Sequence, residues 1–218
     1  MRTKGNTRLY VKKFIVFILG LFLIQVGVAV MLRLNIGSDP FTVFTQGLSK
    51  TLHITAGNAN RFITIFLGIL LLFIDRTYIK IGTLISIIFA GSMMDLMYLI
   101  YGGLSLESYP LLLKSLFFLI ALIPISLGIP MIKLAGIGVA PNDSVYFVLE
   151  DHLKQPYSRV RMASDAVYFV LGIVFGGVIG VGTILCLVCL GPMTGVTIPR
   201  VERLVKAFLK EKEISVKA

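Results

Sequence analysis

The sequence predicts an all-α membrane protein in which six transmembrane helices form two inverted three-helix repeats, each with a short extra helix after a G-x-x-P turn. One observation is composition: 56% of the 218 residues are hydrophobic and 15% are charged, whereas a soluble domain is about 25% charged. Another is a repeat, because IQVGVAVMLRLNIGSDP at residues 24–40 is followed by ISLGIPMIKLAGIGVAP at residues 125–141. Each copy also contains three apolar runs, an odd number, so the second copy enters the membrane from the opposite side. Together these observations predict a single membrane domain over residues 1–218.

The apolar runs define the expected spans, since a bilayer core requires about 20 apolar residues. We expect spans at residues 13–32, 60–74, 81–101, 110–132, 162–177 and 179–198. The last two are separated only by Gly176-Gly177, and without a turn there they would form one run too long for a single span. Repeat one therefore covers about residues 13–101, repeat two covers about residues 110–198, and residues 199–218 form a basic amphipathic cytoplasmic tail.

Individual residues recur at matching places in the two copies. Ile24, Gly27, Ile36, Gly37 and Pro40 recur as Ile125, Gly128, Ile137, Gly138 and Pro141, and Gly82, Thr83, Gly91 and Met93 recur as Gly182, Thr183, Gly191 and Met193. Small residues let membrane helices approach closely. We therefore assign helix packing to the small residues Gly27, Gly82, Thr83, Gly91, Gly128, Gly182, Thr183 and Gly191.

A short segment of mixed polarity follows each proline turn and is too short and too polar to span the membrane. Ser38 or Asp39 can cap a helix that has Pro40 at its first position. The run Pro141-Asn142-Asp143-Ser144 offers the same chemistry. Interrupted segments at matching places in two halves indicate a transporter's binding site. Two arrangements stay open: partly re-entrant helices that reach the repeat interface, or amphipathic connectors that lie flat on the two membrane surfaces.

The basic residues predict that both termini are cytoplasmic, because Lys and Arg concentrate in cytoplasmic loops. With this orientation, the Lys and Arg residues lie inside except for Arg33, Lys50, Arg61 and Lys114. In the tail, the apolar residues are spaced so that they would lie on one face of a helix: Val201, Leu204, Val205, Phe208 and Leu209. We expect this tail to lie as a helix on the anionic cytoplasmic leaflet, with docking of a cytoplasmic partner as the alternative.

Four segments carry a resemblance to a known family. They are IGSDPFTVF after the first span, KIGTLISIIFAGSMMDL in the third, GIGVAPND after the fourth and GVGTILCLVCLGPM in the sixth. With these motifs the chain resembles the YczE/YitT/YyaS group of bacterial membrane proteins of uncharacterised function, from the first span to about Pro199. The resemblance implies a six-span bacterial plasma-membrane protein. The turn of that family carries an acid, which this sequence keeps as Asp143, whereas the first copy has Thr42 at that place and an acid at Asp39.

Ionisable groups in the spans and turns are the candidate binding residues, because a charge inside a membrane is costly and marks functional sites. Asp95 in the third span is either a cation or proton ligand inside the bundle or an acid hydrogen-bonded near the outer interface. The candidate substrate-binding residues are Asp39, Pro40, Arg61, Asp95, Pro141 and Asp143.

Other polar and sulfur-containing residues are given structural roles. Asp165 lies four residues after Arg161, which predicts a local ion pair at the membrane surface. Cys186 and Cys189 are expected to be packing residues, since a disulfide within one helix is geometrically poor. We also expect His53 and His152 to be interfacial and not metal ligands, Pro124 and Pro130 to bend the fourth span, and Gln25 to bond a neighbouring helix or face a cavity.

No catalytic arrangement is evident, so we do not expect an enzyme. The chain lacks an H-E-x-x-H motif, a P-loop and Rossmann glycines, and we expect no cofactor and no metal site. The net charge of +10 is spread between the apolar runs and at the two ends, which argues against nucleic-acid binding.

The favoured function is transport of a small solute, zwitterionic or of mixed charge, through the repeat interface. The alternative is a non-transporting membrane subunit or scaffold that captures a ligand or docks a partner in a larger complex. The expected partners are the lipid bilayer and the solute, and assembly as a homo-oligomer or in a larger membrane complex stays open.

Overall fold

The computed structural model of the protein describes residues 3–54, 56–88 and 106–209, and every regular element in these residues is helical. In chain order the elements are α1 (Thr3–Leu34), α2 (Pro40–Thr51), α3 (Ala56–Ile74), the 3₁₀ helix η2 (Leu106–Ser108), α5 (Leu111–Ala135), α6 (Pro141–Leu153), α7 (Tyr157–Val174) and α8 (Val181–Leu209). Residues 81–88 are also helical and begin the third predicted span. Gly91 and Asp95 lie outside the described residues.

Three helices in the described part, α1, α5 and α8, are long and apolar enough to cross a membrane, and α3 contains a shorter apolar helix. The fifth predicted span corresponds to α7, which starts at Tyr157 and not at residue 162. Its N-cap is Pro156, and the three charged residues Arg159, Arg161 and Asp165 lie within the helix. These charges lower its hydropathy, which is why an apolar run does not mark its beginning.

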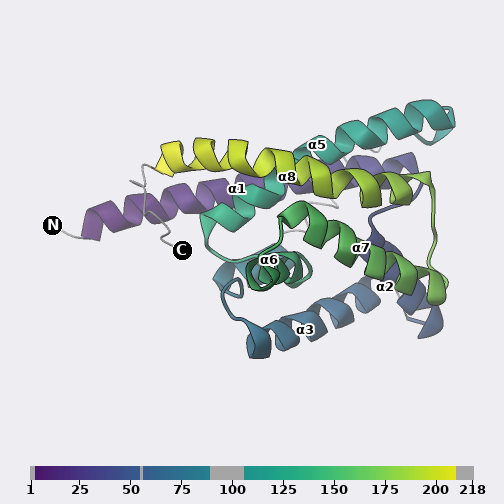
Figure 1. The fold of residues 1–218 in the computed structure, drawn as a ribbon, viewed down its shortest axis with the longest axis horizontal. Coiled ribbons are helices and arrows are strands. Elements are labelled where there is room, and N and C mark those ends of the chain that lie inside the picture. Colours follow the sequence, from purple (N-terminus) through teal and green to yellow (C-terminus); the bar gives the residue numbers. More distant parts are fainter. Residues whose placement is uncertain (1–2, 55, 89–105, 210–218) are drawn as a thin grey trace.

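The helices α1 and α5 pack along each other in opposite directions (Figure 1). A Cβ atom added at Gly128 would lie 2.5 Å from the carbonyl oxygen of Gly20, and one added at Gly27 would meet the carbonyl oxygen of Ala121. A later residue of α1 therefore faces an earlier residue of α5, as antiparallel helices require. The absence of side chains at the two glycines brings the backbones into contact.

Each G-x-x-P turn binds the first turn of a helix from the other predicted repeat. The backbone N–H of Gly182 donates to the carbonyl of Ile36 at 2.8 Å, and the N–H of Gly82 donates to the carbonyl of Ile137 at 3.1 Å. The turns themselves need glycine, because Gly37 and Gly138 have φ values of 119° and 141°, which side chains disfavour. Two equivalent turns are thus held by two equivalent hydrogen bonds.

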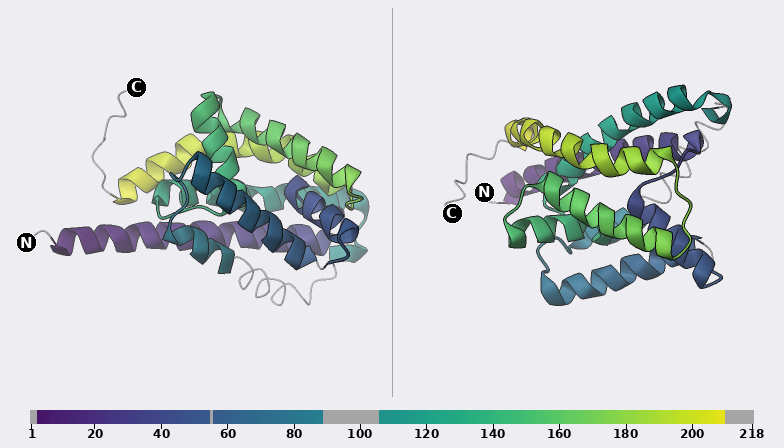
Figure 2. Two further views of the ribbon diagram at one scale, coloured as in Figure 1. Left: turned by 90° about the horizontal axis from the view of Figure 1, so that it is seen from below. Right: turned by 45° about the vertical axis from the view of Figure 1, so that its right-hand side comes forward.

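The short helices pack mainly against the opposite half of the chain (Figures 1 and 2). Helix α2 lies along α7, and α6 contacts α3 as well as α7. At the far ends, the Thr51 hydroxyl donates to the carbonyl of Phe175, and His152 Nδ1 lies 3.8 Å from the carboxylate of Asp75. The end of α2 thereby contacts the turn after α7, and the end of α6 contacts the turn after α3.

The C-terminal segment continues α8 and does not form a separate helix. Helix α8 runs without interruption from Val181 to Leu209, through Pro192 and Pro199. Beyond Pro199, the buried side chains are Val201, Val205 and Leu209, which belong to the same apolar cluster as Val16 and Phe17 of α1. Lys12 of α1 also donates to the carbonyl of Phe208 at 2.7 Å. The start of α1 and the end of α8 therefore lie together.

Pro130 inside α5 leaves the carbonyl of Ser126 without its usual intrahelical donor, because proline has no N–H. The hydroxyl of Thr197 on α8 donates to that carbonyl at 2.5 Å. A side chain of one long helix therefore satisfies the backbone that a proline exposes in another.

Replacing Thr197 by valine is expected to destabilise the protein by about 1 kcal/mol, the usual net value of one hydrogen bond. The matched control is Thr197→Ser, which keeps the hydroxyl and should retain most of the stability. Reversible unfolding in mixed detergent micelles measures both variants. A Thr197→Val protein as stable as the unmodified protein would show that this hydrogen bond contributes nothing, and a larger loss in Thr197→Ser than in Thr197→Val would assign the effect to the methyl group.

Candidate functional site

The first turn of α2 is capped by its own acid. Asp39 is the N-cap, its Oδ1 accepts from the N–H of Thr42 at 3.0 Å, and its Oδ2 accepts from the Thr42 hydroxyl at 2.5 Å. Pro40 occupies the start of the helix and is buried. The capping predicted for this turn is confirmed, and it orients the Asp39 carboxylate at the helix N-terminus.

The first turn of α6 is built differently, and the prediction of an equivalent side-chain cap there is wrong. The N-cap is Ala140, which has no side-chain oxygen, and Pro141 follows it at the helix start. The acid of this turn is Asp143, three residues further along, and its side chain faces Arg161 with Oδ1 at 3.9 Å from Nη1. The acid of the second turn is therefore directed at a cation of α7 and away from its own backbone.

Arg161 lies at the centre of a buried polar cluster. Its Nε lies 3.3 Å from Oδ2 of Asp165, and its Nη1 donates to the hydroxyl of Tyr157 at 2.8 Å. The other carboxylate oxygen of Asp165 accepts from the hydroxyl of Tyr146 at 2.7 Å. Arg161 is only 6% exposed and Asp165 only 1%. The predicted ion pair is confirmed, but it is buried within the protein and not at a surface, because α7 begins earlier and turns both charges inward.

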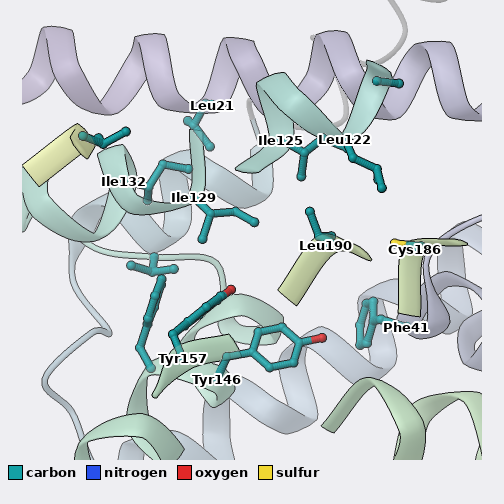
Figure 3. Close-up of a cluster of buried hydrophobic side chains, with 14 of the residues drawn as sticks. Leu21, Phe41, Leu122, Ile125, Ile129, Ile132, Tyr146, Tyr157, Cys186 and Leu190 are labelled. Carbon is teal, nitrogen blue, oxygen red and sulfur yellow. The ribbon is translucent and has the colours of Figure 1, made fainter. Parts of the chain in front are cut away.

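Aromatic rings enclose this pair. The Arg161 guanidinium lies 4.5 Å from the ring centroid of Tyr146, close enough for a cation–π interaction. Tyr146 and Tyr157 lie beneath the leucine and isoleucine side chains of α5 (Figure 3). On the α2 side, the rings of Phe41 and Phe44 pack against Tyr168 of α7 at centroid distances of 5.4 and 6.0 Å. The walls are therefore apolar, and they strengthen the interactions between the charges inside.

The acids of the two short helices share this environment. Asp143 interacts electrostatically with Arg161, Asp39 and Asp165, and Asp165 also interacts with Asp39. Asp143 and Asp165 therefore both face the Arg161 guanidinium, and the Asp39 carboxylate lies near enough to interact with these two acids. Because Asp165 is engaged by Arg161 and Tyr146, and Asp39 by Thr42, Asp143 is the least compensated acid of the cluster.

The remaining candidates lie elsewhere. Arg61 is exposed in the first half of α3 and is not part of the cluster. Pro141 is buried at the start of α6. The other small residues assigned to packing, Gly82, Thr83, Gly182, Thr183 and Gly191, are buried, whereas Gly91 and Asp95 lie outside the described part.

The histidines and cysteines form no metal site in the described part of the chain, where no group of three or more potential ligands occurs. His53 and His152 are both exposed. Cys186 is buried in the apolar cluster, and both cysteines are free. The packing role expected for Cys186 is confirmed.

The Arg161–Asp165 pair was predicted from the sequence, but its place in a cluster with Asp143, and the roles of Tyr157 and Tyr168 of α7, were not. Tyr157, Arg161, Asp165 and Tyr168 follow one another at intervals of four, four and three residues. That spacing places them on a single helix face. A predicted helix that began after Pro156 would have placed these polar and aromatic residues on one face, and Arg161 would not have been assigned to a loop.

In the described part of the chain, these features define a helical membrane protein with a charged cluster at the starts of two short helices. The chain belongs to DUF6198, a family of unknown function, whose model matches residues 11–199. It is 30% identical over 193 residues to the uncharacterized protein YyaS of Bacillus subtilis (strain 168), covering 88% of this chain and 94% of YyaS. It is 25% identical over 201 residues to the uncharacterized membrane protein YczE of the same organism, covering 91% of each chain. No solved structure gives a significant match.

Proposed function

We propose that the protein transports a small solute across the plasma membrane, with the binding site at the interface of two inverted three-helix repeats. The antiparallel packing of α1 against α5 supports the inversion, since these helices hold equivalent places in the two copies. The equivalent hydrogen bonds from Gly182 to Ile36 and from Gly82 to Ile137 support it as well. Inverted repeats of this kind place their substrate sites between the halves.

The observation that carries the proposal is the cluster of Asp39, Asp143, Arg161 and Asp165, in which Arg161 and Asp165 are buried and the other two acids are half-buried. It takes Asp39 from the first half and the other three residues from the second. A charged cluster in a membrane protein costs free energy and is retained where function requires it. Both acids lie at the first turns of interrupted helices, and such segments form the sites of many transporters. This favours partly re-entrant short helices over helices that lie flat on the surfaces.

The solute that fits this site best carries both charges. The carboxylate of Asp143, with that of Asp39 nearby, attracts a cationic group, while the N-terminus of α6, which has no side-chain cap, and the guanidinium of Arg161 favour an anionic one. A small zwitterion satisfies both, whereas a bare ion satisfies only one set. We place both termini in the cytoplasm, because the start of α1 and the end of α8 lie together and both are rich in basic residues.

Asp143→Asn is expected to reduce solute uptake by about tenfold or more while folding is retained, because it removes one charge but keeps the shape of the side chain. The assay is uptake of radiolabelled L-alanine, L-proline and glycine betaine by proteoliposomes that contain the purified protein. Glu202→Gln, which removes an acid paired with Lys206 on α8, is the matched control and should leave uptake unchanged.

Two outcomes would count against this function. If none of the three zwitterions is taken up or raises the melting temperature of the protein, the solute class is wrong. If, in addition, the protein co-purifies in a fixed ratio with a second membrane protein, the non-transporting subunit becomes the better account. An Asp143→Asn protein that fails to fold would be replaced in the assay by Asp143→Glu, which keeps the charge and displaces it.

A further inference from the structure

One end of the molecule is hollowed. A cavity of about 390 Å³ lies where the end of α1, the start of α2, the start of α5 and the turn before α8 meet. It is lined by Leu32, Asn35, Ile36, Gly37, Ser38, Gln46, Leu111, Val178, Ile179, Gly180 and Val181. Gly37 and Ser38 directly precede Asp39, so the hollow adjoins the turn that carries one acid of the buried cluster.

Among the described residues, the lining of this hollow carries no ionisable side chain. Its polar side chains are those of Asn35, Ser38 and Gln46. The amide oxygen of Gln46 is buried and has no hydrogen-bond partner among the described residues. A buried acceptor without a donor costs free energy unless water or a ligand supplies one. The hollow is therefore suited to hold a hydrated or hydrogen-bonding molecule.

At the opposite end of the molecule, the equivalent space is filled. The ammonium group of Lys133 forms an ion pair with Glu150 at 2.6 Å. It also lies 4.6 Å from the ring centroid of Phe147 and 5.9 Å from that of Tyr78. The hydroxyl of Tyr78 donates to Asp151 at 2.6 Å. Burial and the Asp151 carboxylate raise the pKa of Tyr78, so the hydroxyl keeps the proton that it donates.

Further polar contacts close the same end. Lys80 donates to the carbonyl of Gly136 at 3.0 Å, and the N–H of Val139 donates to the carbonyl of Tyr78 at 3.0 Å. The backbone N–H and the hydroxyl of Thr77 both donate to Asp75, which lowers the pKa of that carboxyl and keeps it ionised opposite His152.

The repeat shows that the hollow and the filled end are counterparts. With the spacing that aligns Gly37 with Gly138, Leu32 corresponds to Lys133, Gln46 to Phe147 and Ser49 to Glu150. With the spacing that aligns Gly82 with Gly182, Tyr78 corresponds to Val178 and Lys80 to Gly180. The lysine, the two aromatic rings and the glutamate that fill one end are thus replaced by smaller or uncharged residues at the other.

We infer that the hollow is the entrance through which the solute reaches the buried cluster, and that the Lys133–Glu150 cluster is the closed counterpart at the cytoplasmic end. This inference rests on the proposed function, and it refines the solute class. The described lining of this entrance has no ionisable group that would concentrate ions of either sign, so the entrance suits a solute of zero net charge whose two charged groups are matched at the cluster. Opening the cytoplasmic end requires the Lys133–Glu150 pair to separate.

The test uses two buried reporter positions that correspond in the repeat. Ser38 lines the hollow and is 5% exposed, while Val139 lies in the equivalent turn at the filled end and is 3% exposed. Each is changed to cysteine in a protein that also carries Cys186→Ala and Cys189→Ala, reconstituted in lipid nanodiscs. The labelling rate with a small neutral methanethiosulfonate reagent is then measured.

Ser38→Cys is expected to react about tenfold or more faster than Val139→Cys, because only the first adjoins an open space. Adding Lys133→Met should accelerate labelling at Val139→Cys and slow it at Ser38→Cys, as a shift between two conformations requires. Lys154→Met, which removes an exposed lysine at the end of α6, is the matched control and should change neither rate. Val178→Tyr, which restores the ring found at the filled end, should slow labelling at Ser38→Cys.

Equal labelling rates at the two reporters would overturn the inference, as would Lys133→Met raising one rate without lowering the other. The result is separable from the proposed function, because labelling needs no solute. If the solute is taken up but the two reporters are labelled at equal rates, the proposed transport function stands and the proposed entrance is wrong. If the two labelling rates differ and change together as expected, but no zwitterion is taken up, the proposed entrance stands and the proposed solute class is wrong.

Discussion

Replacing Arg161 by methionine is expected to destabilise the protein by about 3–5 kcal/mol, the range for removing one partner of a buried ion pair. Asp165 would remain buried with only the Tyr146 hydroxyl as a partner, and Asp143 would lose its neighbouring cation. Methionine has a similar length and fits the aromatic walls, so the loss would arise from the unpaired charges and not from an empty space. The free energy of unfolding in mixed detergent micelles gives the measurement.

Two further variants test this explanation. Arg159→Met removes an exposed arginine two residues earlier in α7, whose guanidinium contacts Gln155 at 3.3 Å, and should cost well under 1 kcal/mol. The double variant Arg161→Met/Asp165→Leu removes both buried charges and should be more stable than Arg161→Met alone. A double variant that is less stable than the single one would contradict the assignment of the loss to an uncompensated Asp165.

The second large effect is expected at the contact between α1 and α5. In Gly128→Ala, the new methyl group would lie 2.5 Å from the carbonyl oxygen of Gly20 and 2.7 Å from Cγ1 of Ile24. The two backbones must separate to accept it, so we expect a loss of about 1–3 kcal/mol, as for overpacked cores. Gly27→Ala should behave in the same way, because its methyl group would lie 2.5 Å from Cγ1 of Ile125.

The control for this prediction is Gly68→Ala on α3. The nearest atom to its new methyl group would be Cγ of Pro141 at 3.5 Å, an ordinary contact. Alanine favours a helix over glycine by up to about 1 kcal/mol, so this variant should be neutral or stabilising. Thermal unfolding of the three variants compares them directly, and a destabilised Gly68→Ala together with a stable Gly128→Ala would refute the close approach of α1 and α5.

Much of the order of the helices can be predicted from the sequence, because apolar runs and turn residues depend on neighbouring residues in the chain. The break at Gly176 is one example: its φ of 76° is a conformation that glycine adopts easily, and α7 ends just before it. The cap of α2 by Asp39 is another, since it depends only on residues next to one another in the chain. The recurrence of Gly27 as Gly128 also indicated close packing, and both glycines lie in the contact between α1 and α5.

Features that depend on tertiary packing could not be obtained in this way. The segment after Pro199 is helical as far as Leu209, but it continues α8, because Val201 and Val205 pack into the apolar cluster and keep the helix continuous beyond the proline. Arg161 resembled a loop charge because hydropathy cannot show that Asp165, Tyr157 and Asp143 surround it. The contrast between Lys133 and Leu32 could be seen in the sequence, but only the structure shows that one fills a space that the other leaves open.

The exchange of short helices between the halves has a consequence for how the chain is assembled. Helix α2 is synthesised well before α7, the helix on which it packs. Until the second half arrives, the buried face of α2, which includes Phe41, Val43 and Thr45, lacks that surface. We therefore expect α2 to reach its final packing only once α7 is in place, so that the first half completes its fold late, together with the second half.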